Sequence, residues 1–146
     1  MKKSLLFSLI FLLSVSCQKQ VDASDLQKIN GYWEIEKVVF DDGSEKPYTS
    51  NETYDYFKVV DKRGFRKKVT PQLNGTFLVN NSQEDVTITE LAGKFYISYS
   101  TPFAKWKEEL MAVSDKELVT VNQSKNEYHY KRAFPINIIS NGKKAQ

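Results

Sequence analysis

The chain has 146 residues, of which 40% are hydrophobic and 13% aromatic, and it carries a formal charge of +3 at pH 7. This length allows one hydrophobic core but not two, and the aromatic content with only 4 prolines excludes a disordered tether. Loss of Lys2 and Lys3 with the leader would leave 19 basic against 18 acidic residues, so we expect no nucleic-acid partner.

The N-terminus has the features of a secretory signal. Two lysines precede an apolar run over residues 5–15, which is shorter than the roughly 20 residues that cross a bilayer. The stretch Leu13-Ser14-Val15-Ser16-Cys17 resembles a lipobox, and Cys17 is the only cysteine. We therefore predict a lipoprotein signal peptide over residues 1–16 and a palmitate-type acyl anchor on Cys17. The alternative is ordinary cleavage nearby, which would leave Cys17 as a free thiol.

An acylated Cys17 would place the protein in the cell envelope. Each buried methylene contributes about 0.8 kcal/mol, so two or more acyl chains hold a protein stably at a membrane. Gln18 follows the cysteine in place of the aspartate that commonly retains lipoproteins at the inner membrane, which favours the outer membrane. Periplasmic and surface exposure both remain open.

After the anchor, residues 17–30 are expected to form a spacer in which Leu26 and Ile29 mark one helical turn. The apolar pattern then changes to a period of two, with turn signals between short runs. The predicted strands cover residues 32–40, 54–60, 65–70, 76–79, 86–90, 94–100, 106–113, 117–121 and 127–133.

Eight or nine short strands in series, with no helix long enough for a crossover, indicate an all-β, antiparallel arrangement. Such strands close as an up-and-down barrel or stack as a sandwich, and closure removes exposed edges. We expect one barrel domain over residues 31–133, and a C-terminal extension and tail over residues 134–146, in which apolar residues 134–139 pack back on the domain.

The first and last strands carry residues that fit together in a closed barrel. Gly31-Tyr32-Trp33 opens the first strand, and the last contains Tyr128-His129-Tyr130-Lys131-Arg132. Because first and last strands are neighbours in a barrel, Arg132 could lie across the indole of Trp33, a cation–π contact worth about 0.5–2 kcal/mol.

With this pair of motifs the chain resembles the lipocalin superfamily, and most closely the short lipocalin-like domain lipoproteins of bacteria, over residues 25–133. The stretches 64–68, 75–77 and 103–109 add to the likeness. The resemblance implies a barrel closed at one end by Trp33 and Arg132, with a mouth at the other end for a small apolar molecule. Alternatively, the contact between Trp33 and Arg132 only closes the barrel and has no further role.

The residues offer little for catalysis, so we expect no enzyme, no cofactor and no metal site. His129 is the single histidine, lies out of phase with its tyrosine neighbours and lacks partners of its kind. Glu108 and Glu109 are adjacent in a predicted strand and therefore point to opposite faces. No nucleophilic triad and no phosphate-binding glycine loop is present.

Two groups of residues are candidate binding sites. Large interior or rim side chains could line a pocket or fill it, since eight strands leave room for side chains or one small ligand, and we expect a mostly filled core with a shallow opening. A cationic hairpin could contact anionic lipid head groups, or be a solvated edge. The pocket or rim candidates are Tyr48, Phe57, Phe95, Tyr99, Phe103 and Trp106, and the lipid-patch candidates are Lys62, Arg63, Arg66, Lys67 and Lys68.

These features favour a non-catalytic, lipid-anchored, lipocalin-like protein of the cell envelope, a monomer that binds a small hydrophobic or amphipathic molecule. The alternative is an envelope scaffold or a protein or membrane interaction module, with a filled barrel and no ligand. An apolar cavity of about 300 Å³ or more would favour the first function, and a large exposed apolar patch the second.

Overall fold

A computed structural model describes residues 20–135 of the chain. The predicted signal peptide, Cys17, residues 136–139 and the tail over residues 140–146 lie outside the described residues. Among residues 20–135, no helix has the length and apolar character needed to cross a membrane.

The described chain is one short helix followed by strands. The 3₁₀ helix η1 (Ala23–Ile29) begins after Asp22, whose carboxylate accepts a 2.8 Å hydrogen bond from the Ser24 backbone N–H. The strands are β1 (Gly31–Val39), β2 (Glu45–Pro47), β3 (Tyr54–Val60), β4 (Arg63–Pro71), β5 (Phe77–Val79), β6 (Glu84–Leu91), β7 (Lys94–Ser100), β8 (Lys105–Val113), β9 (Glu117–Val121) and β10 (Glu127–Ala133).

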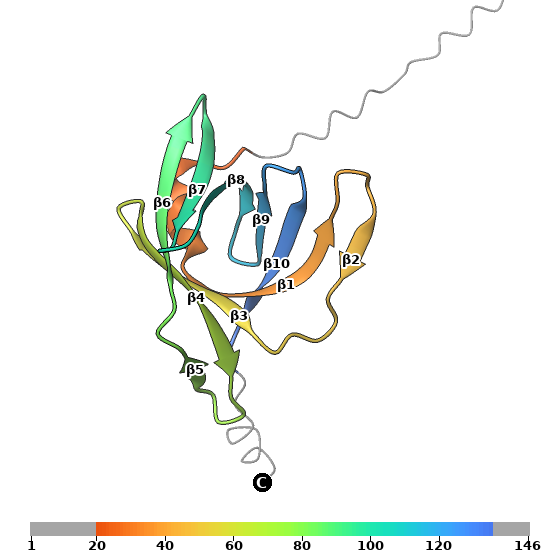
Figure 1. Cartoon of the computed structure of the whole chain (residues 1–146), viewed down its shortest axis with the longest axis vertical. Helices are drawn as coiled ribbons and strands as arrows, with labels where there is room; N and C mark the ends of the chain where they lie inside the picture. The colour runs from red at the N-terminus through yellow and green to blue at the C-terminus, as the bar shows by residue number, and fades with distance from the viewer. Residues whose placement is uncertain (1–19, 136–146) are drawn as a thin grey trace, which may run out of the picture.

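The strands close into an antiparallel barrel, which confirms the predicted fold class (Figure 1). Its wall runs β1, β3, β4, β6, β7, β8, β9 and β10, and β10 returns to pair with β1. Two strands lie outside this circuit: β2 pairs only with β1, and β5 only with β4. The segment predicted as a strand over residues 76–79 is therefore an outside strand and not part of the wall.

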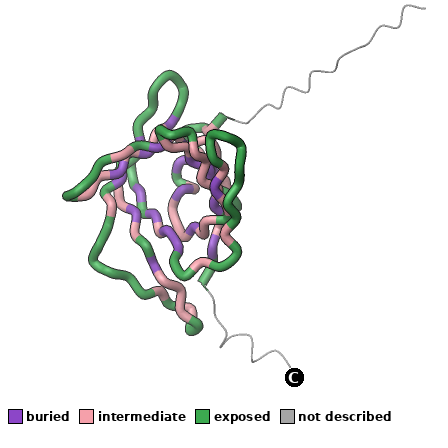
Figure 2. Tube along the Cα trace, turned by 45° about the vertical axis from the view of Figure 1, so that its right-hand side comes forward, coloured by how far each residue is buried: buried purple, intermediate pink, exposed green. Residues whose placement is uncertain are grey.

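The two ends of the barrel differ. At the closed end lie η1, the β3–β4 and β6–β7 turns and residues 114–116, between β8 and β9. At the other end, the mouth, lie residues 101–104 and 122–126, which join β7 to β8 and β9 to β10. Figure 2 shows that buried stretches line the walls while the connecting turns are mostly exposed.

The core fills the closed half of the barrel. Strand alternation turns one residue in two inward, and these residues form one continuous apolar cluster with η1. Ile29 and Trp33 are fully buried, and the Trp33 indole N–H donates a 2.7 Å hydrogen bond to the Ile29 carbonyl. Other members of the cluster are Leu26, Phe57, Val59, Val86, Ile88, Phe95, Ile97, Tyr99, Leu110, Val113, Leu118 and Tyr130.

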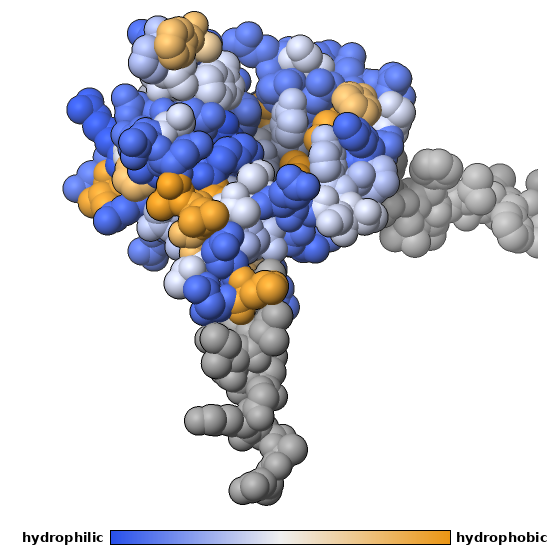
Figure 3. Space-filling view, turned by 60° about the horizontal axis from the view of Figure 1, so that its bottom comes forward, coloured by the Kyte–Doolittle hydropathy of each residue, from blue (hydrophilic) through white to orange (hydrophobic). Residues whose placement is uncertain are grey.

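A second apolar cluster lies on the outer face of the wall, where β5 covers it. Tyr32 points outward because Trp33 points inward, and its ring stacks on Phe77 of β5 with centroids 4.1 Å apart. Leu78 and Val79 of the same strand are exposed. The space-filling view shows such exposed apolar side chains as small groups among hydrophilic ones (Figure 3).

Candidate functional site

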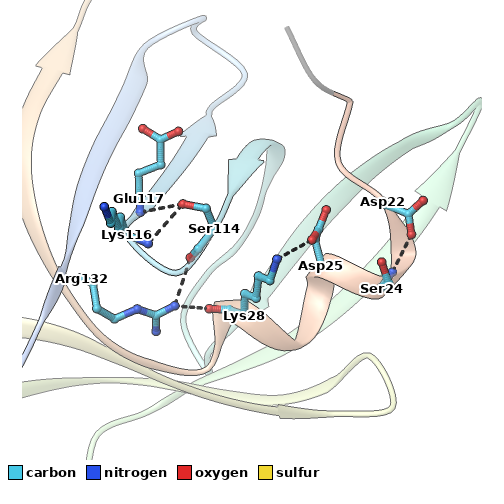
Figure 4. Close-up of polar contacts among 8 residues, drawn as sticks. All are labelled: Asp22, Ser24, Asp25, Lys28, Ser114, Lys116, Glu117 and Arg132. Atoms are coloured by element: carbon cyan, nitrogen blue, oxygen red, sulfur yellow. Dashed lines mark hydrogen bonds and ion pairs between the residues drawn. The ribbon is translucent and has the colours of Figure 1, made fainter.

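Arg132 seals the closed end of the barrel (Figure 4). Its guanidinium carbon lies 3.8 Å from the Trp33 ring centroid. Arg132 on β10 and Trp33 on β1 are directly paired across the two strands. Its guanidinium also donates 2.6 Å hydrogen bonds to the carbonyls of Asn30 and Lys28, and a 3.2 Å bond to that of Ser114. Burial lowers the pKa of Arg132. One cation therefore ties η1 to both β1 and the β8–β9 turn.

Gly31 is required at this end for two reasons. Its φ of +113° lies in the region that L side chains avoid, and a Cβ there would come within 2.8 Å of Arg132 Nη1. The Gly-x-Trp opening thus leaves space for the guanidinium and places the indole beneath it.

Nearer the mouth, the interior changes from apolar to polar. Four inward-facing residues at this level, called here the polar layer, are nearly inaccessible to solvent, with 1–8% of their surface exposed. They come from β3, β4, β8 and β9 and are Asp55, Arg66, Glu108 and Thr120.

Arg66 is the central cation of the polar layer. It forms an ion pair with Glu84, and its guanidinium carbon lies 4.3 Å from the centroid of Tyr99. On the next strand, Trp106 stacks on Tyr99 with centroids 5.1 Å apart. Burial opposes the charge of Arg66, but its hydrogen bond to Glu84 raises the pKa above the ordinary value. Arg66 is therefore a permanent charge inside the barrel.

The acidic members of the polar layer have different partners. Asp55 pairs with Lys68 at 2.6 Å. Glu108 accepts a 3.4 Å hydrogen bond from the Tyr99 hydroxyl and forms no ion pair within residues 20–135. Burial, followed by the charge of Glu108, raises the pKa of Tyr99 well above its usual value.

Thr120 is 1% exposed, and its hydroxyl has no hydrogen-bond partner among the described residues. It faces inward on β9, in register with Leu110 on one side and Tyr128 on the other. An unpaired buried hydroxyl is costly unless a ligand or water satisfies it.

A pocket of about 330 Å³ opens at the mouth, above the polar layer. We call it the mouth pocket. Trp106, Glu108 and Tyr128 contribute from β8 and β10, and the Asn122 side-chain amide donates a 3.1 Å hydrogen bond to the Tyr128 hydroxyl. The remaining lining residues are Lys107, Gln123 and Ser124.

The structure divides the predicted pocket and rim residues. Trp106 lines the mouth pocket, while Phe57, Phe95 and Tyr99 belong to the filled core, where Tyr99 stacks on Trp106. Tyr48 follows β2 outside the barrel wall, beneath the ammonium of Lys46. Phe103, in the β7–β8 connection, is 97% exposed and projects into solvent. Both residues lie beside strand breaks, which place a residue at an end of the barrel but not on its inner side.

Of the five residues of the predicted lipid patch, Arg66 is buried and cannot contact lipid head groups, while lipid contact by the other four stays a prediction. Alternation along β4 turns Arg66 inward, where it pairs with Glu84, and Lys68 on the same face pairs with Asp55 while its side chain stays 55% exposed. Lys62, Arg63 and Lys67 form no ion pair within residues 20–135. Lys67 lies over the ring of Phe65, and Lys62 over that of Phe95.

As predicted, Glu108 and Glu109 point to opposite faces of the strand. Glu109 faces outward and pairs with Lys94 at 2.8 Å. Glu108 was not among the predicted site residues, although its alternation with Trp106 and Leu110 indicates an inward side chain. His129 contacts Glu127 at 3.0 Å, away from the polar layer. No group of side chains suited to a metal ion occurs within residues 20–135.

The chain is similar to one protein-family model and to two solved structures. Residues 29–120 match the family model described as a lipocalin-like domain. A lipocalin-like protein from Bacteroides uniformis is similar in structure, with a TM-score of 0.48 and 10% identity, covering 73% of this chain and 99% of that one. An uncharacterised protein from Bacteroides eggerthii is similar with a TM-score of 0.46 and 9% identity. The match covers 71% of this chain and 98% of that one. No curated protein matches the chain. The chain belongs to the lipocalin-like domain family.

Proposed function

We propose that this protein is a lipid-anchored binding protein of the cell envelope, which holds one small amphipathic molecule at the mouth of its barrel and catalyses no reaction. The lipocalin-like fold suggests a binding role, because barrels of eight strands have room for one small ligand. The observation that carries the proposal is the mouth pocket of about 330 Å³, where Trp106 lies beside the buried carboxylate of Glu108.

The filled core in the closed half of the barrel limits the size and polarity of the ligand. Core side chains such as Ile97 and Leu118 are fully buried, so a long apolar molecule would have to displace them. At the mouth, the ligand would meet the aromatic rings of Trp106 and Tyr128 and the buried carboxylate of Glu108. An amphipathic ligand of modest size suits these surroundings better than a purely hydrophobic one.

The proposed anchor would direct the mouth away from the membrane. Only Gln18 and Lys19 separate Cys17 from Gln20, a span of about 10 Å at full extension. The Gln20 side chain bonds the Gly93 carbonyl in the β6–β7 turn, at the closed end. Acyl chains on Cys17 would therefore hold the closed end beside the lipid and leave the mouth free to exchange ligand.

Native mass spectrometry of protein purified from its own membranes tests the proposal. We expect an acylated chain that retains one small molecule, and loss of that molecule in Trp106→Ala. Phe103→Ala is the matched control, because Phe103 is an exposed aromatic residue at the same end of the barrel. An acylated chain with no retained molecule in either the parent or the control would contradict ligand binding and support the interaction module instead.

A further inference from the structure

One ionisable side chain in the interior near the mouth has no partner of opposite charge among the described residues. Arg66 pairs with Glu84, and Lys68 pairs with Asp55, which satisfies both cations that face this region. Glu108 remains without a cation in residues 20–135, although it is 8% exposed. Burying a carboxylate without a counter-ion is unfavourable, and one hydrogen bond of 3.4 Å from Tyr99 compensates for little of it.

The surroundings of Glu108 would suit a cation from outside the chain. Glu108 lines the mouth pocket together with the rings of Trp106 and Tyr128. Tyr99 covers one face of Trp106, the guanidinium carbon of Arg66 lies 5.9 Å from the Trp106 ring centroid, and Trp106 also lines the pocket. Aromatic faces attract ammonium groups, and this attraction strengthens where water is excluded.

The unpaired hydroxyl of Thr120 does not line the mouth pocket, but it lies one inward position deeper in the barrel than Glu108. Thr120 pairs in register with Leu110, the next inward residue of β8 after Glu108, so the hydroxyl and the carboxylate are diagonal neighbours on the inner face. A hydroxyl can accept a hydrogen bond from an ammonium N–H. Lys107, which also lines the pocket, lies over the outward ring of Tyr96 at 4.7 Å and is engaged there.

We propose that the mouth pocket selects molecules that carry a protonated amine, with Glu108 as the counter-ion and Trp106 and Tyr128 as the aromatic walls. This inference rests on the proposed function, since it names the chemical class of the ligand. An anionic ligand would meet an unneutralised carboxylate, and a neutral one would leave Glu108 unpaired.

Three probes of similar size test the selection: 3-phenylpropylamine, 3-phenylpropanol and 3-phenylpropanoate, titrated calorimetrically into the full-length protein. We expect the amine to bind about tenfold or more tightly than the alcohol, and the carboxylate to bind most weakly. Glu108→Gln should reduce the affinity for the amine to that for the alcohol. Glu109→Gln, which alters the adjacent outward carboxylate, should leave the order unchanged.

Equal affinities of the parent protein for the amine and the alcohol would overturn the inference, even if Glu108→Gln failed to fold. In that case the proposed function would stand, because the pocket would still bind the probes without regard to charge. Failure of all three probes to bind would overturn the inference as well. Native mass spectrometry of the retained molecule would then decide the proposed function separately, since it does not depend on the head group.

Discussion

Replacement of Arg132 tests the closure of the barrel. The guanidinium makes two 2.6 Å bonds to the carbonyls of Asn30 and Lys28, and hydrogen bonds to charged groups contribute about 1.5–3 kcal/mol each. Its contact with Trp33 adds about 0.5–2 kcal/mol. Because one partly exposed group makes all these contacts, the contributions do not sum, and we expect Arg132→Ala to lower the free energy of unfolding by about 3–4 kcal/mol.

Arg132→Lys separates the charge from the hydrogen bonds. A lysine ammonium keeps a cation near the indole but lacks the planar fork that reaches two carbonyls, so we expect about half of the loss seen with alanine. Urea denaturation followed by tryptophan fluorescence measures both variants. Lys131→Ala is the control, because Lys131 is an exposed residue on the same strand with a 3.4 Å pair to Glu34, worth less than about 1 kcal/mol. If Arg132→Ala cost no more than Lys131→Ala, the closure would not depend on Arg132.

Three further predictions concern other parts of the barrel. Gly31→Ala should lower the free energy of unfolding by about 1–3 kcal/mol, because the Cβ meets Arg132 in a strained backbone conformation; an unchanged urea midpoint would refute this. Phe77→Ala should lower the melting temperature by removing the stack on Tyr32. Phe77→Leu should restore only part of the lost melting temperature. Burial raises the pKa of Tyr130, so its contribution to stability is complete below pH 10 and lost as pH rises further; Tyr130→Phe should weaken the alkaline unfolding transition seen by circular dichroism.

The barrel could be predicted from the sequence because the patterns that indicate strands and turns are local. The period of two sets which residues face inward, and the turn residues set where each strand ends, so the antiparallel order follows from chain order. The outside position of β5 could not be predicted this way. It depends on the register with the far end of β4, from Val69 to Pro71, which no local pattern encodes.

The candidate site was harder to predict than the fold. The run of cations from Lys62 to Lys68 has the composition of an exposed hairpin, and this composition concealed the inward alternation of Arg66. The role of Arg66 depends on Glu84 and Tyr99, which come from two other strands. Single residues on separate strands become a site only once the pairing register is known.

A crystal structure of the protein isolated from its own membranes would test the central claim most directly. We predict electron density for one small molecule in the mouth pocket, in contact with Trp106 and with an amine nitrogen within hydrogen-bonding distance of Glu108. A molecule held anywhere else on the barrel, or an acylated protein whose mouth contains only water, would contradict the account.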